Sequence, residues 1–234
     1  MTSSRVPDER EYVHERLGAD FERALSSYDT TRRVETLIDD FLPDDLVRGK
    51  EVLDVGCGLG YFSERLHERG ARVTATDLGP NLVEATRRRV GCHAEVADAL
   101  RLVEHFGPDR FDVVVSSECI EHTPDPAAAL RQMAGVLKPG GHLAVSTPNL
   151  VWSPVVKLAT RLGLRPFDGF ENFSTWRSLR DPLRDGGVTV VRRHGLHLFP
   201  FQFGAHGVSR WCDARLQALN PLMINLCVLG RKEG

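Results

Sequence analysis

The chain has 234 residues, and its 30 Lys and Arg residues nearly balance its 32 Asp and Glu residues, for a formal net charge of −2 at pH 7. Nucleic acids and anionic membrane surfaces attract proteins with surplus positive charge, so this balance excludes a general electrostatic binder of either. With 41% hydrophobic and 26% charged residues, the composition also excludes a disordered chain. We expect a soluble globular protein with one main domain and a full hydrophobic core.

The cysteines and the amino terminus indicate the compartment. The five cysteines are odd in number and too far apart for a zinc knuckle, which fits a reducing environment better than a disulfide framework. Residues 1–11 are polar and acidic, unlike a signal peptide, and no window approaches the ~20 apolar residues of a membrane span. We therefore expect a cytoplasmic protein without a transmembrane segment.

The first segment of the chain is predicted to be helical. Residues 8–47 carry apolar side chains at helical spacing, among them Val34, Leu37, Ile38 and Phe41. We predict that residues 1–50 form a helical cap or lid.

From residue 51 onward, short β-rich runs alternate with helical stretches, which is typical of a parallel sheet wrapped by helices. Residues 111–116 read FDVVVS, a continuous apolar run expected of a strand covered on both faces. The predicted strands are 51–55, 72–76, 93–96, 111–116, 142–146, 188–193 and 223–229, and the predicted helices are 61–69, 80–90 and 126–137. The pattern predicts an α/β fold with a doubly wound, Rossmann-like, mostly parallel seven-stranded sheet and helices on both faces.

Three further regions follow from this pattern. Residues 51–148 are predicted to be the cofactor-binding core. Residues 149–187 come after the fifth strand, where an α/β sheet places loops over its ligand crevice, and they are predicted to hold an insertion and a helix over the active site. Residues 188–234 would supply the last strands of the sheet and complete the pocket for the substrate, the acceptor pocket.

A glycine-rich turn follows the first predicted strand, in the sequence VLDVGCGLG. Its glycines, Gly56, Gly58 and Gly60, lack the Cβ atoms that would keep a ligand away from the backbone, and a helix amino terminus comes next. Their spacing, G-x-G-x-G, differs from the dinucleotide pattern G-x-G-x-x-G. Asp54 lies two residues before the first glycine, where a carboxylate suits an ammonium group better than a pyrophosphate. The turn therefore argues against a nicotinamide-dependent oxidoreductase.

Acidic residues also follow the next two predicted strands. Asp77 can accept hydrogen bonds from both hydroxyls of a ribose. Asp98 can accept from an exocyclic amine, and the backbone N–H of Ala99 can donate to a ring nitrogen. A ligand with an amino-acid end, a ribose and an adenine is S-adenosylmethionine.

Most of residues 51–148 resemble the class I S-adenosylmethionine-dependent methyltransferases. The motifs VLDVGCGLG, VTATD, ADA, FDVVVSSECIEH and LKPGGHLAVSTPN stand in the order and spacing of that family. The resemblance implies a cofactor site made of Asp54, Gly56, Gly58, Gly60, Asp77, Leu78, Asp98, Ala99 and Ser117.

The predicted lid adds two candidate residues to this site. The sequence YDTTRR resembles the helix that closes over the cofactor in these enzymes. That resemblance implies that Tyr28 lies near the methyl group and Arg33 near the methionine carboxylate.

An acidic and histidine-containing step, E-x-x-E-H, follows the fourth predicted strand. On one turn of helix this spacing would put Glu118 beside Glu121 and His122. The three side chains can hold a hard divalent cation such as Mg²⁺. Alternatively, His122 can act as a general base that Glu121 orients.

Two branches of the family share this step. The stretch SSECIEHTPDPAAAL resembles the ubiquinone-biosynthesis O-methyltransferases, and the small-RNA 2′-O-methyltransferases share EH and TPN. In both branches the glutamates and the histidine hold a divalent metal beside the methylated hydroxyl, and a downstream histidine can complete the set. Residues 170–174 read FENFS where that histidine would be expected, so this chain departs from the pattern.

The E-x-x-E-H step favours oxygen as the methyl acceptor. An alcohol or phenol must lose its proton as it attacks, and a metal or a base can assist, whereas a neutral amine mainly needs positioning. We predict direct in-line transfer to a hydroxyl of a small molecule, such as a phenol, a quinone precursor, or a sugar or nucleoside.

Other functions remain open at this point: an N-methyltransferase of a small amine, an RNA 2′-O-methyltransferase, and an inactive cofactor-binding partner of another enzyme. The near-neutral charge favours a small acceptor and no nucleic-acid partner. We expect a monomer or a homodimer.

Overall fold

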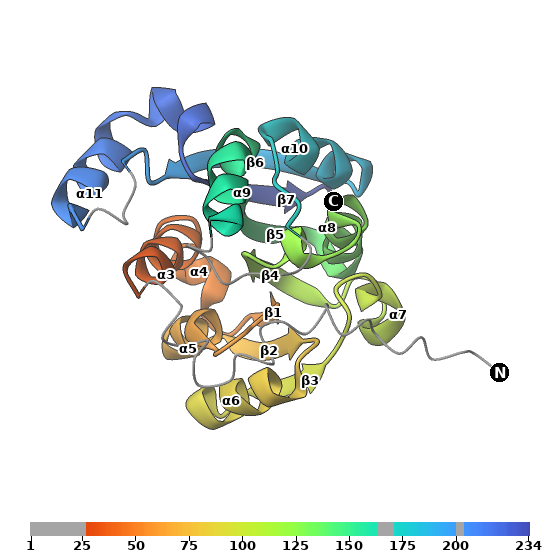
Figure 1. Cartoon of the computed structure of the whole chain (residues 1–234). Helices are drawn as coiled ribbons and strands as arrows, with labels where there is room; N and C mark the ends of the chain where they lie inside the picture. Colours follow the sequence, from red (N-terminus) through yellow and green to blue (C-terminus); the bar gives the residue numbers. More distant parts are fainter. Residues whose placement is uncertain (1–26, 163–170, 200–203) are drawn as a thin grey trace.

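The computed structural model describes residues 27–162, 171–199 and 204–234. Seven strands form one sheet in the order β3-β2-β1-β4-β5-β7-β6 (Figure 1). They are β1 (Glu51–Val55), β2 (Arg72–Asp77), β3 (His93–Val96), β4 (Phe111–Ser117), β5 (Leu137–Pro148), β6 (Val188–Leu196) and β7 (Asn225–Lys232). Neighbours from β3 to β5 are parallel, and β7 runs antiparallel to both β5 and β6. The predicted α/β sheet is therefore confirmed.

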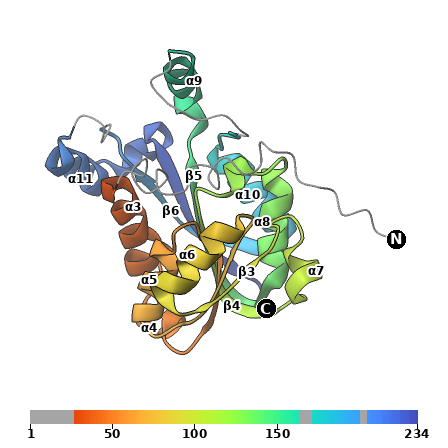
Figure 2. The ribbon, with the colours of Figure 1, turned by 60° about the horizontal axis from the view of Figure 1, so that its bottom comes forward.

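Helices cover both faces of the sheet (Figure 2). One layer contains α7 (Leu102–Phe106), α8 (Pro126–Val136) and α10 (Trp176–Asp185). The other contains α3 (Ser27–Val34), the π-helix η2 (Glu35–Asp40), α4 (Asp44–Val47), α5 (Tyr61–Glu68) and α6 (Pro80–Val90).

Alternation along the strands assigns each side chain to one of these layers. In β1, Leu53 packs into the cluster that contains Met133 of α8, whereas Val52 packs into the cluster that contains Ile38 and Leu66. Successive strand residues face opposite sides of a sheet, so a strand buried on both faces is apolar throughout.

Several boundaries differ from the prediction. The sequence KPGG, predicted to separate a helix from the fifth strand, lies inside β5, which begins directly after α8. The strand pairs with β4 across an irregularity between Phe111 and Val113. α7 was not predicted because five residues are too few for a periodic pattern. α11 (His206–Arg215) was not predicted either.

The segment after β5 divides into two parts. The short helix η4 (Leu150–Trp152) and α9 (Ser153–Arg161) stand beyond the carboxyl end of β5 (Figure 2). α10, in contrast, packs against α8 and β6 as part of the helical layer. The 3-10 helix η6 (Gln217–Leu222) lies next to η4, where the indole N–H of Trp152 donates to the carbonyl of Leu222 at 2.9 Å.

Parts of the predicted lid and insertion, namely residues 1–26 and 163–170, lie outside the described residues, as do residues 200–203. Within the rest of the chain, no helix has the length and apolar character needed to cross a bilayer.

Candidate active site

The carboxyl ends of β1, β2 and β3 meet at one edge of the sheet. The parallel register pairs Val55 with Thr76, and Asp77 with Val96. The backbone N–H of Ala97 donates to the carbonyl of Asp77 at 3.1 Å, which brings the loop after β3 next to the end of β2. This edge is where doubly wound sheets bind their ligands.

The glycine turn after β1 has a backbone that favours glycine at three positions. Gly56, Gly58 and Gly60 have φ angles of 75°, 53° and 85°. A Cβ atom on Gly56 would lie 2.5 Å from the Sγ atom of Cys119, and one on Gly60 would lie 3.0 Å from the Oγ1 atom of Thr86. The turn is therefore held between Cys119, two residues beyond β4, and helix α6.

We expect the substitution Gly56→Ala to destabilise the fold more than Gly91→Ala. Gly91 is left-handed too, with φ of 71°, but a Cβ atom added there would meet nothing within 4 Å. Both variants should lose about 1–2 kcal/mol for left-handed backbone, and Gly56→Ala a further ~1–3 kcal/mol through the clash with Cys119. Urea unfolding measures both, and equal losses would contradict the close packing of the turn.

Asp54 lies beneath this turn and is only 2% exposed. The hydroxyl of Ser63, in the first turn of α5, donates to its Oδ2 atom at 2.6 Å. Burial, partly offset by this hydrogen bond, raises the pKa of Asp54 to about 7. A cation brought next to Asp54 would therefore shift its protonation near neutral pH.

Asp77 connects the turn to the end of β2. Its Oδ2 atom accepts from the backbone N–H of Gly58 at 3.0 Å, and its Oδ1 atom accepts from that of Gly79 at 3.0 Å. The carboxylate is partly exposed, and a carboxylate can accept several hydrogen bonds, so it can take part in binding a ribose. Leu78, also partly exposed, follows it.

The adenine side of the predicted site lies after β3. The Oδ1 atom of Asp98 accepts from the backbone N–H of Leu100 at 2.8 Å, which fixes the carboxylate at the start of this loop. Ala99 between them is buried. Both positions thus lie in the loop after β3, which runs next to the end of β2.

A chain of hydrogen bonds runs across the ends of β4 and β5. The Nη1 atom of Arg33 donates to the hydroxyl of Ser117 at 2.7 Å. The hydroxyls of Ser117 and Ser146 are 2.8 Å apart, and that of Ser146 donates to the Oε1 atom of Glu118 at 3.1 Å. Ser117 is thus linked to the lid and to the acidic step at once.

The E-x-x-E-H step does not occupy a regular turn of helix, so that prediction was wrong. Glu118 has a left-handed backbone with φ of 51°, and only the short 3-10 helix η3 (Ile120–His122) follows it. Glu121 is 2% exposed and accepts from the hydroxyl of Thr147 at 3.2 Å. His122 is partly exposed at the end of η3.

The pKa values of both glutamates in the E-x-x-E-H step are raised. Burial, and then the neighbouring Glu118 carboxylate, raises the pKa of Glu121 well above its usual value. Loss of hydration also raises the pKa of Glu118, although the nearby Arg33 guanidinium lowers it. The two buried carboxyls of this step therefore hold their protons to higher pH than an exposed glutamate does.

The donor set predicted for Mg²⁺ is not assembled. Across residues 27–162, 171–199 and 204–234, no three His, Cys, Asp or Glu side chains are grouped so that they could hold a metal ion. Asn172, from the stretch that replaces the expected downstream histidine, does lie here. It donates from its backbone N–H to the carbonyl of Glu121 at 2.9 Å and from its side chain to the carbonyl of Thr123 at 2.8 Å. An amide thus occupies this place, and Glu118, Glu121 and His122 do not fit a divalent cation.

The lid residues have clear neighbours. Arg33 is buried and pairs with Asp29 at 2.9 Å, while its guanidinium reaches Ser117. The hydroxyl of Tyr28 donates to the carbonyl of His206 at 3.0 Å, and the two rings stack with centroids 3.9 Å apart. Tyr28 therefore lies against α11, and its role near the methyl group stays a prediction.

The sequence reasoning missed several side chains of the site. Ser63 and Thr86 have local signals, since both lie on the sheet-facing side of their helices. Ser146 faces Ser117 through the β4–β5 register. Asp29 and His197 are hydrogen-bonded across 168 positions of the chain, which no local pattern could show.

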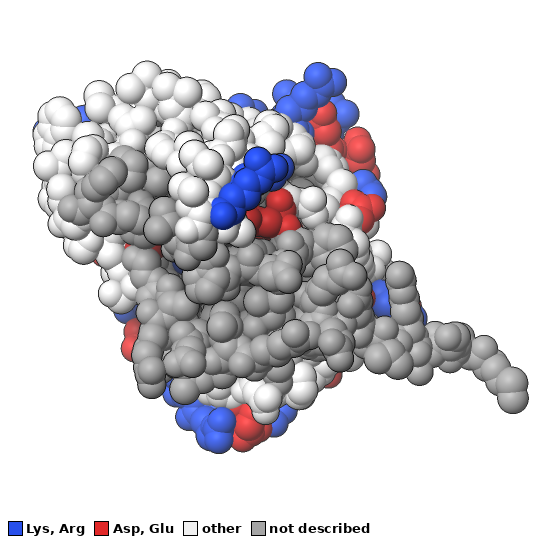
Figure 3. Space-filling model, viewed as in Figure 1, with Lys and Arg blue, Asp and Glu red and all other residues white. Residues whose placement is uncertain are grey.

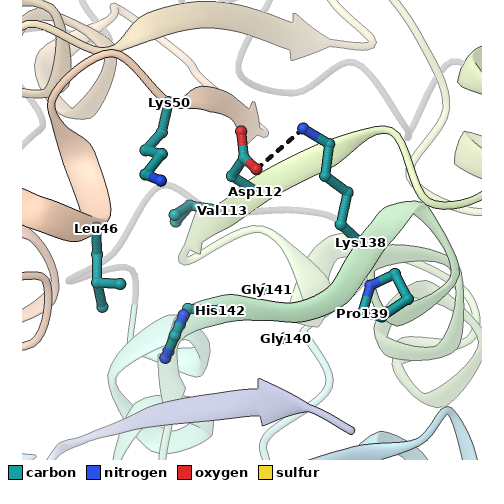
Figure 4. Close-up of a pocket in the computed structure, with 9 residues that line it drawn as sticks. All are labelled: Leu46, Lys50, Asp112, Val113, Lys138, Pro139, Gly140, Gly141 and His142. Carbon is teal, nitrogen blue, oxygen red and sulfur yellow. Dashed lines mark hydrogen bonds and ion pairs between the residues drawn. The ribbon is translucent and has the colours of Figure 1, made fainter. Parts of the chain in front are cut away.

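A hollow lies at the opposite edge of the sheet (Figure 4). It is lined by Leu46, Lys50, Asp112, Val113, Lys138, Pro139, Gly140, Gly141 and His142. Lys138 pairs there with Asp112 at 2.9 Å. Because this is the amino-terminal edge of β4, away from the carboxyl ends, we do not assign it to the active site.

Comparison with known proteins shows which proteins this chain resembles. Residues 26–196 match a family model described as methyltransferase domain. Over 105 residues the chain is 45% identical to the ubiquinone biosynthesis O-methyltransferase of Xanthomonas euvesicatoria pv. vesicatoria, a match that covers 43% of this chain and 44% of that protein. A relative of the same name from Xanthomonas campestris pv. campestris matches over the same shares. The chain thus matches less than half the length of these curated relatives.

Solved structures share the fold. The magnesium protoporphyrin IX methyltransferase of Synechocystis PCC 6803, with bound SAH, superposes with a TM-score of 0.68 at 16% identity, over 96% of this chain and 98% of that one. An S-adenosylmethionine-dependent methyltransferase from Mesorhizobium loti gives 0.65 at 22% identity, over 85% and 98%. At these identities the likeness concerns the fold alone.

Proposed function

Because the chain belongs to the methyltransferase domain family, we propose that it transfers the methyl group of S-adenosylmethionine to a hydroxyl of a small molecule. One observation carries the choice of oxygen: Cys119, within the E-x-x-E-H step, approaches the glycine turn so closely that a Cβ atom added to Gly56 would lie 2.5 Å from its Sγ atom. A base next to the transferred methyl group is what an alcohol or phenol requires. The partial likeness to ubiquinone biosynthesis O-methyltransferases supports the same acceptor class.

Different residues along the carboxyl edge of the sheet would bind different parts of the cofactor. Asp54 would hold the ammonium group, Asp77 with Leu78 the ribose, and Asp98 with Ala99 the adenine. Gly56, Gly58 and Gly60 would let the backbone approach the methionine side, and Ser117, Tyr28 and Arg33 would close over it. When bound, S-adenosylmethionine supplies an electrophilic methyl group.

On the acceptor side, His122 would take the hydroxyl proton as the oxygen attacks. Glu121 lies beside it, held by Thr147, and would fix the position of the imidazole. Transfer is direct and in line, with no covalent enzyme intermediate, because the residues needed are a base and positioning groups rather than a nucleophile.

The surface supports a small acceptor over RNA. On the face in Figure 3, basic and acidic side chains of the described residues lie next to each other. The arginines of α10 follow the same pattern: Arg177 and Arg180 both pair with Asp181, at 3.2 and 2.7 Å. A polyanionic substrate would favour an unpaired basic stripe.

The acceptor class is tested with matched pairs that differ in one atom type, such as phenol against aniline and catechol against o-phenylenediamine. Initial rates of transfer from labelled S-adenosylmethionine should be measurable for hydroxyl members and absent for the amines. Turnover on the amines alone would overturn O-methylation in favour of N-methylation.

We expect a chelator to leave the rate unchanged. Without a metal donor set among the described residues, proton removal falls to His122. The measurement compares EDTA-treated enzyme with enzyme given excess Mg²⁺ or Mn²⁺. Loss of activity on chelation and recovery on metal addition would show that the cluster rearranges to bind a cation.

A further inference from the structure

His197 follows β6 in a position that the mechanism does not use. Its side chain is fully buried, and its backbone is left-handed with φ of 63°, which is uncommon for a residue with a Cβ atom. The Nε2 atom lies 2.8 Å from the Oδ1 atom of Asp29, and the Nδ1 atom lies 3.4 Å from the hydroxyl of Ser209. His197 therefore joins helix α3 of the lid to helix α11.

Asp29 uses its two oxygens for different partners. Oδ1 faces His197, whereas Oδ2 accepts from Arg33, with Nε at 3.1 Å and Nη2 at 2.9 Å. Burial would raise the pKa of Asp29, but Arg33 and His197 outweigh it and lower the pKa to about 2. The carboxylate thus stays ionised and holds the guanidinium in one orientation.

Arg33 is connected in turn to the acceptor side of the site through hydrogen bonds that reach Glu118. A guanidinium only donates hydrogen bonds, so Ser117 accepts from Arg33 and directs its own proton to Ser146, which donates to Glu118. Glu118 is also left-handed. Of the three non-glycine residues with positive φ in the described ranges, two, His197 and Glu118, thus stand at the two ends of one chain of polar contacts. Unusual backbone at both ends is typical of a constrained functional site.

We propose that His197 is a positioning residue of the acceptor site, which acts through Asp29 and Arg33 to fix Ser117 and Glu118 beside the bound hydroxyl. The proposal rests on the proposed function, because it takes the acceptor to bind next to Glu118. Helix α11 lies beside α3 (Figure 1) and contacts His197 through Ser209. Under this proposal, α11 therefore influences the geometry of a site that is built mainly at the ends of β1 to β5.

Two substitutions of His197 separate this role from a backbone role. In His197→Gln, the amide nitrogen reaches the place of Nε2 and can still donate to Asp29. In His197→Asn, the amide nitrogen reaches only the place of Nδ1, although Asn tolerates left-handed backbone better than Gln does. We expect His197→Gln to keep kcat/KM for the hydroxyl acceptor within a few-fold of wild type, and His197→Asn to lose roughly tenfold to 100-fold. The opposite order would overturn the proposal.

A readout besides activity makes the result independent of the acceptor. The Nε–H of Arg33, held by Asp29, should give a protected arginine signal in ¹⁵N NMR spectra of wild type and His197→Gln, and that signal should be lost in His197→Asn. If no hydroxyl is methylated by the wild type, the proposed function fails, while the NMR comparison still decides the positioning role. A signal unchanged in His197→Asn would overturn that role.

The variant Asp29→Asn tests the same path if the His197 variants unfold. It keeps the shape of the side chain but removes the charge that orients Arg33. We expect the same loss in kcat/KM as for His197→Asn, and no further loss in the double variant, because both changes break one path. The proposal would be overturned if the losses in kcat/KM of the two single variants added in the double variant. It would also be overturned if the losses in kcat/KM were explained by lower melting temperatures alone.

Discussion

The variant Asp54→Asn is expected to bind S-adenosylmethionine roughly tenfold more weakly, or worse, because it loses a charged contact with the ammonium group. The same change should stabilise the cofactor-free protein above neutral pH. A carboxyl whose folded-state pKa is raised from 3.8 to about 7 binds more protons in the folded than in the unfolded state across that window. The free energy of unfolding therefore falls as the pH rises from about 4 to 7, and asparagine removes that loss.

Titration calorimetry and urea unfolding at pH 6 and pH 8 test both halves of this prediction. The affinity of the wild type for S-adenosylmethionine should rise with pH, by up to about tenfold per unit below the pKa, with release of a proton. Asp54→Asn should show little of this pH dependence. Asp185→Asn, on the exposed end of α10, is the matched control and should behave like wild type. A wild-type affinity that does not change between pH 6 and pH 8 would contradict the assignment of Asp54.

Replacing His122 by Ala should reduce turnover by roughly 100-fold or more, the contribution typical of a general base. The affinity for S-adenosylmethionine should stay within about twofold, because the proposed cofactor contacts come from Asp54, Asp77 and the glycine turn and not from His122. Single-turnover rates and calorimetric dissociation constants give the two quantities separately. The wild-type rate should also depend on pH through a group that must be deprotonated, and this dependence should be absent in His122→Ala.

The control for this variant is His93→Ala. His93 is an exposed histidine at the start of β3, where it pairs with Glu95 at 2.9 Å, away from the acidic step. We expect wild-type turnover and wild-type cofactor affinity for it. Equal losses of turnover and affinity in His122→Ala would show structural damage rather than loss of a base.

The sequence predicted the sheet well where local signals mark the ends of elements. β1, β3 and α6 begin and end at the predicted residues, since Gly56, Pro80 and Gly91 interrupt the pattern at their boundaries. β5 was predicted too short because Pro139 and Gly140 are typical of a turn. Its extension depends on pairing with β4 and β7, which the local sequence does not contain.

The sequence shows which candidate residues follow which strand, but it does not show their conformation. The E-x-x-E-H spacing is typical of helix, yet Glu118 is left-handed because the chain bends sharply out of β4. The burial of Asp54 under Ser63 sets its pKa, and spacing alone cannot show burial. The contact between Asp29 and His197 depends on how α3 meets the segment after β6, so it requires the fold.

In the proposed function, a hydroxyl oxygen receives the methyl group at the site beside Glu118 and His122. The most direct test is to supply ¹³C-methyl S-adenosylmethionine to the enzyme with an equimolar mixture of catechol and o-phenylenediamine, and to record the ¹³C spectrum of the products. We predict a single methoxy signal that is lost in His122→Ala. A methyl signal on nitrogen, or tight cofactor binding with no labelled product from any acceptor, would contradict the claim.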